Sequence, residues 1–267
     1  MIIEGNLLKM HSVLKSPVDY FLQSNGNEYY LNELLGKTIS IEFQHEIYCI
    51  HCGRKTNKSF SQGYCYPCFT NIPQTDVGVI RPELNRAHEG ISRDMEWSKK
   101  NDLIDHFVYL SLTSDVKVGV TRYTQIPTRW IDQGAEYAII LAKTPYRQLA
   151  GLIEVALKGY LNDKTNWRKM LTGNVKEIPD LLELKEVYAG YLPSEFHEFI
   201  SDNDEITHIE YPVLAYPAKV NSIGLDTTSK FSGKLMGIKG QYWIFENGGV
   251  LNIRKHNGYR VSLVVKD

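Results

Sequence analysis

The chain has 267 residues, which is enough for two or three compact units. Hydrophobic residues make up 43% and charged residues 23% of it, a balance typical of soluble proteins, and no apolar run is long enough to cross a bilayer. The net charge of −1 excludes a basic field over the whole chain, so a polyanionic partner has to be held by a local patch.

Residues 1–48 predict a β segment, because stretches such as 38–43 alternate between apolar and polar side chains. The chain starts Met1-Ile2-Ile3 and turns polar at once, without the pattern of a signal peptide. We therefore expect a reducing compartment, the cytoplasm.

The four cysteines form two C-x-x-C pairs, Cys49 with Cys52 and Cys65 with Cys68. Two such turns complete the tetrahedral shell that Zn²⁺ prefers, and Gly53 suits the bend after the first pair. Two disulfides or a redox C-x-x-C motif are the weaker alternatives. We predict a structural zinc ribbon over residues 49–69, whose closed Cys₄ site leaves no position for a substrate.

Basic and aromatic side chains alternate in the ribbon, a mixture found in nucleic-acid contacts. The aromatic residues are equally consistent with a small ribbon core; they are Phe60, Tyr64, Tyr66 and Phe69. The residues predicted to bind nucleic acid are Arg54, Lys55 and Lys58 of the ribbon and Arg122 further along the chain.

Residues 70–105 lose clear periodicity and predict a long connecting segment. Because its glycines are few, we expect this segment to be packed down rather than free. Residues 106–202 predict strand, strand, helix, helix and a further helix, beginning with strands at 107–112 and 116–121.

Short motifs follow one another in this central segment: Val108-Tyr109, Lys117-Val118-Gly119, Arg129 and Glu154. In their order and spacing they resemble the GIY-YIG endonuclease superfamily, in the variant whose second strand reads K-[VI]-G-x-T. The resemblance implies a GIY-YIG-like α/β domain with Arg129 as its helix arginine, Glu154 as its metal-binding glutamate and Asn166 as its final asparagine.

Such a site would cleave phosphodiesters with the help of Mg²⁺ or Mn²⁺. The resemblance implies that Tyr109 assists water activation and that Arg129 forks onto the phosphate. Glu154 would hold one metal ion that keeps most of its waters. Lys117 would lower the pKa of a nearby phenol or hold a phosphate as a point charge.

The sequence departs from that pattern in its second motif, where the usual tyrosine is absent and Lys117-Val118 stands instead. Tyr123 is a candidate substitute. Glu154 lies at the edge of the apolar face of its helix, which predicts a partly sheltered carboxylate.

Each candidate also has a purely structural interpretation. Tyr109 would be a core aromatic, and Arg129 would pair with Asp132 or Glu136. Glu154 would pair with Lys158, one helical turn further on.

Residues 203–267 return to strands and predict a C-terminal β domain. Residues 241–245 and 250–253 flank Asn247-Gly248, a hairpin signal because Asn-Gly tolerates positive φ. A weak similarity between residues 4–10 and 232–237 indicates that the two terminal β segments pack together.

Nearly the whole chain carries further landmarks: Cys-Gly-Arg-Lys-Thr at 52–56, Gly-Tyr-Cys-Tyr-Pro-Cys at 63–68, Thr-Arg-Trp-Ile-Asp-Gln-Gly at 128–134 and Gly-Ile-Lys-Gly-Gln-Tyr at 237–242. In these it resembles an uncharacterised family of bacterial proteins. We expect members to carry additional cysteines where this chain has Thr75, Gly78, Asn85, Ser92 and Asp102. If those cysteines hold a second metal or a cluster, this chain lacks it.

Together these patterns predict an α+β protein with terminal β elements, a Cys₄ zinc ribbon and a central GIY-YIG-like domain. The function expected is a metal-dependent endonuclease that acts on DNA or RNA, with no membrane partner. The alternatives are a zinc-ribbon protein that binds nucleic acid without cutting it, and a scaffold that binds a protein partner.

Overall fold

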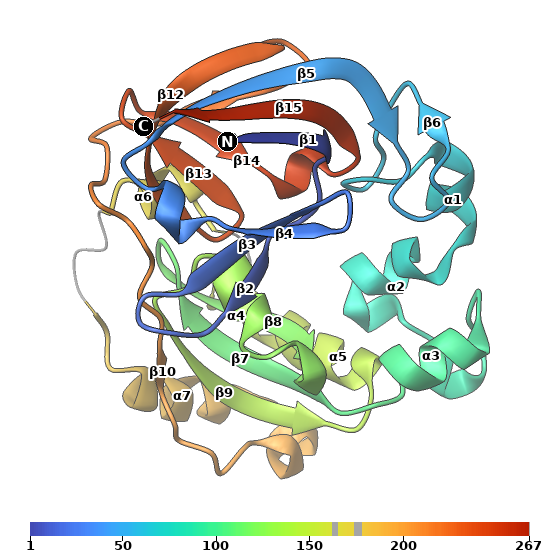
Figure 1. Cartoon of the computed structure of the whole chain (residues 1–267). Coiled ribbons are helices and arrows are strands. Elements are labelled where there is room, and N and C mark those ends of the chain that lie inside the picture. The colour runs from blue at the N-terminus through green and yellow to red at the C-terminus, as the bar shows by residue number, and fades with distance from the viewer. Residues whose placement is uncertain (162–164, 174–177, 267) are drawn as a thin grey trace. The chain divides into compact units, whose positions relative to one another are not determined.

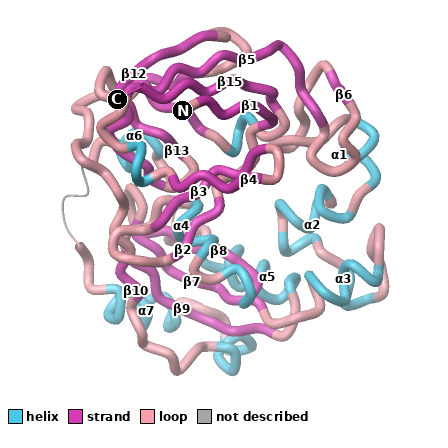
Figure 2. The backbone as a smooth tube through the Cα atoms, in the orientation of Figure 1, coloured by secondary structure: helices cyan, strands magenta, loops and turns pink. Residues whose placement is uncertain are grey.

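The computed structural model describes residues 1–161, 165–173 and 178–266 and shows a mixed α+β protein. Figure 2 distinguishes its strands, helices and loops. The strands are β1 (Ile2–Asn6), β2 (His11–Val13), β3 (Asp19–Ser24), β4 (Asn27–Tyr30), β5 (Thr38–Tyr48), β6 (Lys55–Thr56), β7 (His106–Leu112), β8 (Val116–Arg122), β9 (Tyr137–Thr144), β10 (Thr207–His208), β11 (Asn221–Ile223), β12 (Lys230–Lys239), β13 (Tyr242–Phe245), β14 (Gly249–Asn252) and β15 (Tyr259–Lys266). The α-helices are α1 (Tyr66–Asn71), α2 (Val77–Ile80), α3 (Met95–Asn101), α4 (Thr128–Asp132), α5 (Arg147–Leu157), α6 (Trp167–Leu171) and α7 (Leu181–Gly190). No helix in this described part of the chain is both long and apolar enough to cross a membrane.

The chain divides into two compact units, and each is discontinuous in sequence. The first unit consists of Met1–Phe69, Leu171–Asn174 and Ile209–Asp267, and the second of Thr70–Met170 and Val175–His208. The predicted zinc ribbon therefore belongs to the first unit, and the predicted GIY-YIG motifs belong to the second.

The first unit is built on one large sheet that contains strands from both ends of the chain. Its strand order is β1-β15-β5-β12-β13-β14-β11, with the short β6 added to β5. The long β5 lies between β15 and β12 and pairs antiparallel with both, as can be followed in Figure 1. Along β5 the side chains of Ile39, Ile41 and Phe43 alternate into the core. Burial of each such side chain contributes about 1.5–3 kcal/mol.

The predicted hairpin near the C-terminus is confirmed. β13 and β14 are antiparallel, with Trp243 opposite Leu251 and Ile244 opposite Val250. The turn uses Gly248 at φ +77°, and a Cβ atom at this position would lie 2.4 Å from the carbonyl oxygen of Lys219. The turn therefore requires glycine for two independent reasons.

The second unit is built on a four-stranded antiparallel sheet in the order β10-β9-β7-β8. β7 and β8 confirm the two predicted strands. The predicted order of strand, strand, helix, helix was wrong in one respect: strand β9 lies between helices α4 and α5 and pairs with β7. One face of this sheet packs on helix α5. The core between them is hydrophobic, and its buried residues include Val108, Leu110, Val118, Ile153 and Leu157.

The connecting segment at 70–105 is packed down, as expected, and it contains short helices. Gly151 of α5 lies against the 3₁₀ turn Pro82–Leu84, and a Cβ atom on Gly151 would lie 2.3 Å from the backbone nitrogen of Glu83. Arg147 of the same helix donates to the carbonyl oxygens of Gly78 and Val79, at 2.7 and 2.6 Å. The segment is therefore held to α5 by close backbone packing and a forked arginine.

Candidate functional site

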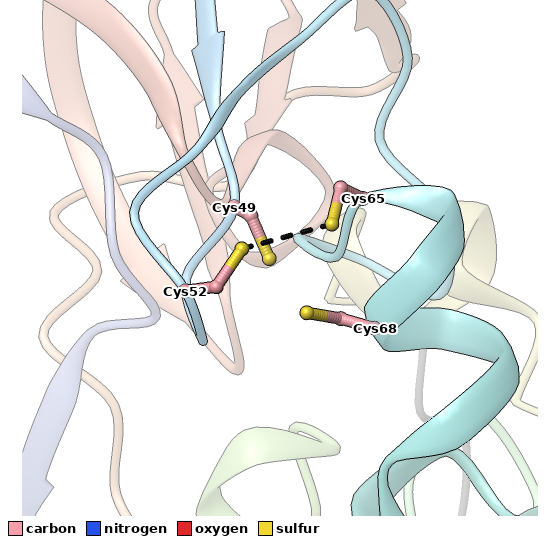
Figure 3. A group of neighbouring side chains, drawn as sticks. All are labelled: Cys49, Cys52, Cys65 and Cys68. Carbon is pink, nitrogen blue, oxygen red and sulfur yellow. Dashed lines mark hydrogen bonds between the residues drawn. The ribbon is translucent and has the colours of Figure 1, made fainter.

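The four cysteine thiols converge in the first unit. Their Sγ atoms all lie within 4.8 Å of one another, and the Sγ atoms of Cys52 and Cys65 are 3.7 Å apart. Figure 3 shows them pointing toward a common centre, two from the loop after β5 and two from the start of α1. A tetrahedral ion at about 2.3 Å from each sulfur would set them about 3.8 Å apart. This geometry fits a zinc ion, and none of the four forms a disulfide.

The backbone of the first pair explains how its thiols come together. Gly53 adopts φ +69° and donates to the carbonyl of Cys49, which closes the tight turn predicted from sequence. Burial tends to raise the pKa of Cys49, but hydrogen bonds from the backbone of Cys52, Cys65 and His51 outweigh it and bring the pKa to about 6. Cys49 is therefore suited to act as a thiolate ligand at neutral pH.

The aromatic residues of the ribbon pack on each other. The ring of Phe60 lies 5.4 Å from that of Tyr66 and 5.7 Å from that of Phe69, and Phe60 and Tyr64 form a β-bridge. These contacts agree with the interpretation of the aromatics as a small ribbon core. The Tyr66 side chain remains largely exposed.

The predicted nucleic-acid-binding residues lie in different surroundings. Arg54 is exposed, whereas the ammonium group of Lys55 pairs with Glu46 at 2.6 Å. Lys58 is exposed and lies over the Phe60 ring, with 5.3 Å between Nζ and the ring centroid. Arg122 is half-buried in the second unit.

All four predicted catalytic side chains line one cavity of about 180 Å³ in the second unit. Tyr109 comes from β7, Lys117 from β8, Arg129 from α4 and Glu154 from α5. The connecting segment supplies the remaining wall through Val79, Ile80 and Pro82. We call this space the charged cavity.

The first two motifs meet across the β7–β8 hairpin, where Tyr109 is directly opposite Gly119. A Cβ atom on Gly119 would lie 2.6 Å from the Tyr109 hydroxyl oxygen and 2.7 Å from Cζ. The tyrosine ring therefore occupies the space that a side chain at 119 would need. This close approach gives a physical reason for glycine in the second motif.

Tyr109 is fully buried, and its hydroxyl donates to Oε1 of Gln133 at 2.9 Å. Burial raises the pKa of this hydroxyl, and the charge and hydrogen bond of Arg129 offset that effect only in part. Tyr109 is therefore a neutral phenol at physiological pH.

The charged cavity carries a strong excess of positive charge. Lys117, Arg129, Arg147 and Lys158 all line it, and Glu154 is the one carboxylate among its described lining residues. The Glu154 side chain is 12% exposed, which confirms the expected sheltered carboxylate, and it pairs with Lys158 at 3.6 Å. This pair is also the structural alternative considered above. Guanidinium and ammonium groups that line one cavity in this way are suited to hold a phosphate.

Two residues named from the resemblance lie elsewhere. Asn166 does not line the charged cavity; its Oδ1 accepts a hydrogen bond from the backbone of Lys169 at the start of α6. Tyr123 is 50% exposed in a 3₁₀ turn after β8 and does not line the cavity either. Tyr123 therefore does not replace the missing tyrosine of the second motif, and Asn166 does not join the other motif residues at the cavity.

Two polar lining residues, Gln133 and Arg147, were missed from the sequence. Gln133 stands within the landmark at 128–134, but its contact with Tyr109 depends on how α4 packs on β7. Arg147 donates hydrogen bonds mainly to backbone carbonyl oxygens. Because every residue has such a carbonyl, the sequence does not indicate these partners. Burial lowers its pKa to about 10, so it keeps its charge at neutral pH.

The positions where family members are expected to carry extra cysteines lie around another space in the same unit. Asn85, Ser92 and Asp102 line a cavity of about 350 Å³. A Cβ atom on Gly78 would lie 2.9 Å from Cα of Asn85, and Arg93, which also lines the cavity, lies 3.4 Å from the Thr75 hydroxyl. In this protein, hydrogen bonds link Ser92 to Ser98 and Ser98 to Asp102, and these three side chains form part of the wall of this cavity.

The fold and the sites together define a two-unit α+β protein with a Cys₄ cluster in one unit and a positively charged cavity in the other. The chain belongs to the family described as "Protein of unknown function (DUF2797)", whose sequence profile matches residues 36–261. No curated protein and no solved structure matches the chain.

Proposed function

We propose that the second unit is a GIY-YIG-like nuclease that cleaves phosphodiesters in DNA or RNA. The observation that carries the proposal is the convergence of Tyr109, Lys117, Arg129 and Glu154 on one cavity, although they lie on four different elements. The family description names no activity, so the support comes from this geometry and from the order of the motifs.

The positive side chains account for substrate binding and for charge stabilisation. A phosphodiester in the charged cavity would neutralise part of its positive charge, and Arg129 offers a planar fork to two phosphoryl oxygens. Negative charge grows on these oxygens during cleavage, so fixed cations nearby stabilise the transition state more than the ground state. Lys117, which is 5% exposed, acts at close range in this low-dielectric surrounding.

Glu154 is the residue that would hold a Mg²⁺ or Mn²⁺ ion. A single carboxylate fits an ion that keeps most of its waters and takes further oxygen ligands from the substrate. Such an ion would supply Lewis-acid stabilisation of the phosphoryl group. Because four cationic side chains share the cavity, Glu154 would bind such an ion well only when phosphate charge is also present.

Tyr109 has a narrower role than the resemblance implies. Its raised pKa prevents it from acting as the base at neutral pH. As a neutral phenol fixed by Gln133, it orients the attacking water or a phosphate oxygen by hydrogen bonding. Loss of its hydroxyl should therefore slow cleavage more than it weakens binding.

The second candidate function is a binding module that does not cut. The ion pair between Glu154 and Lys158 favours it, because a carboxylate that is already paired need not hold a metal. In this case Arg129 and Lys117 would bind a phosphate, and Glu154 would only maintain the cavity.

Cleavage of labelled single-stranded, duplex, branched and RNA substrates with Mg²⁺ or Mn²⁺ tests the proposal. We expect metal-dependent cutting by the wild type and, in Glu154→Gln, a loss beyond the roughly 10–100-fold typical of outer-shell groups. Glu186→Gln, an exposed glutamate of α7, is the matched control and should cut normally. Binding without cutting on every substrate would instead establish the binding module.

A further inference from the structure

A separate cavity of about 410 Å³ lies in the first unit, between the ribbon and the C-terminal part of the sheet. The ribbon contributes Asn57, Lys58, Ser59 and Gln62, and the opposite wall comes from Asp226, Lys255 and Tyr259, with Ile47 of β5 completing it. Its volume lies within the range of about 300–1,000 Å³ typical of ligand clefts. We call it the ribbon cavity.

The two walls of the ribbon cavity are tied together by short hydrogen bonds. Asn257 donates from Nδ2 to the carbonyl of Gln62 at 2.9 Å. The backbone nitrogen of Tyr48, at the end of β5, donates to the carbonyl of Gly258 at 2.7 Å. Gly258 has φ +83°, and a Cβ atom there would lie 2.0 Å from the Tyr48 carbonyl oxygen. The cavity is therefore built in advance by backbone contacts, which lowers the entropic cost of binding.

His256 fixes the basic turn beside Lys255. The ring is fully buried; Nε2 accepts from the backbone nitrogen of Leu225 at 3.1 Å, so Nδ1 carries the proton and donates to the Asn252 carbonyl at 2.8 Å. This neutral histidine connects the turn at 254–256 with the loop that carries Asp226. It holds the Lys255 backbone and the Asp226 loop in one arrangement.

The charges in the ribbon cavity favour an anion. Lys58 and Lys255 are both exposed, and neither has a carboxylate within ion-pair distance in the described part of the chain. The Ser59 hydroxyl is buried there and has no hydrogen-bond partner among the described residues. Two lysines and an unsatisfied hydroxyl around one cavity offer a donor set that a phosphate would satisfy.

We propose that the ribbon cavity binds a backbone phosphate of a polynucleotide through Lys58, Lys255 and Ser59. The inference rests on the proposed function, since it assigns substrate binding to the first unit and cutting to the second. It also selects among the basic residues of the ribbon: Lys55 is already paired with Glu46, whereas Lys58 is not paired with any carboxylate of the described residues.

Asp226 makes the proposal more specific. Its two carboxylate oxygens lie 3.0 and 3.2 Å from the Tyr259 hydroxyl, which places a negative charge on one wall of the ribbon cavity. The phosphate therefore sits on the side of Lys58 and Lys255. Asp226→Asn keeps an acceptor for Tyr259 and removes the opposing charge, so it should tighten binding.

The test measures the affinity of fluorescently labelled single-stranded and duplex oligonucleotides by anisotropy over a series of salt concentrations, without Mg²⁺ so that the strand stays intact. In Lys58→Gln/Lys255→Gln, the magnitude of the slope of log K against log salt should fall by about two for duplex DNA. Lys219→Gln/Lys266→Gln removes the same charge from exposed lysines of the same unit outside the cavity. This control should keep a slope closer to that of the wild type.

Two further variants distinguish phosphate binding in the ribbon cavity from nonspecific attraction by surface charge. Ser59→Ala should weaken binding with an unchanged slope, because it removes a donor and no charge, and Asp226→Asn should strengthen binding. If both double variants lose affinity equally, or if Ser59→Ala binds like the wild type, the ribbon cavity is not the site. If the slope changes as expected but no substrate is cut in the cleavage assay, the proposed nuclease activity is rejected, whereas phosphate binding by the ribbon cavity is supported.

Discussion

Gly119 shows how one missing side chain determines the geometry of the charged cavity. Its backbone conformation is ordinary, and the requirement for glycine comes only from the ring of Tyr109, which lies where a Cβ atom would be. The ring is fully buried and cannot retreat without moving the wall of the cavity.

We expect Gly119→Ala to destabilise the protein by about 1–3 kcal/mol, the usual cost of overpacking a core. It should also displace Tyr109 and impair any cleavage. Urea unfolding followed by tryptophan fluorescence measures the loss. Gly190→Ala is the control, since no atom of the described residues lies within 4 Å of a Cβ there and helix α7 gains an alanine. Equal stability of both variants would contradict the close approach.

His106 is a second residue whose environment has a measurable consequence. It is fully buried, and burial, followed by the charges of Arg147 and Arg122, lowers its pKa to about 4. The folded protein thus binds fewer protons here than the unfolded chain does between pH 4 and pH 6.5. The free energy of unfolding should therefore be highest above the pKa that His106 has in the unfolded chain. It should fall by roughly 3 kcal/mol as the pH drops toward 4.

Unfolding free energies at pH 7 and pH 4.5 check this expectation. His106→Gln removes the titrating group and should flatten the pH dependence, even if it lowers stability at pH 7. An unchanged pH dependence in that variant would show that other groups cause the loss.

At the scale of elements, the ribbon depends on its cysteines because it spans few residues and its core is a small aromatic cluster. We expect Cys65→Ser to lose bound zinc and to increase hydrogen exchange over residues 49–69. Metal analysis and exchange mass spectrometry measure both effects. His51→Ala is the control and should retain zinc, because the cluster that could hold the ion consists of the four thiols. Loss of zinc from His51→Ala would assign the histidine a ligand role.

The elements also show what the sequence allows one to predict. Strands β7 and β8 have clear motifs, and the hairpin of β13 and β14 has a strong turn signal. β9 was missed because its apolar run is continuous, with both faces largely buried. Periodicity cannot distinguish such a strand from a buried helix. The charged cavity was anticipated in its four motif residues but not in Gln133 or Arg147, whose contacts are purely tertiary.

For the whole molecule, the pairing of the chain ends in the first unit has a direct consequence for stability. β15 pairs with β1 on one side and with β5 on the other, so Ile2 lies opposite Val264. No local pattern predicts a pairing over this sequence distance; the weak similarity between the terminal segments was the only indication.

A chain that ends at Gly258 lacks β15 and leaves β1 without its partner and β5 with one open side. We expect such a chain to lose the cooperative unfolding transition of the first unit. Trp243 lies in the core of this unit and reports on it by fluorescence. Removing only Lys266 and Asp267 should have little effect. Retention of a native transition without β15 would show that the rest of the sheet folds on its own.

The discontinuity of the first unit also affects the order of events during synthesis. Strands β1 and β5 leave the ribosome early, but their shared partner β15 is made after all the other described strands. At about 5–20 residues per second, β5 waits on the order of ten seconds or more with an unpaired edge. The motif-bearing sheet of the second unit, by contrast, is complete soon after β9 and β10 have emerged. Newly made chains should therefore depend on a chaperone that covers exposed strand edges, and this need arises from the order of the strands along the chain.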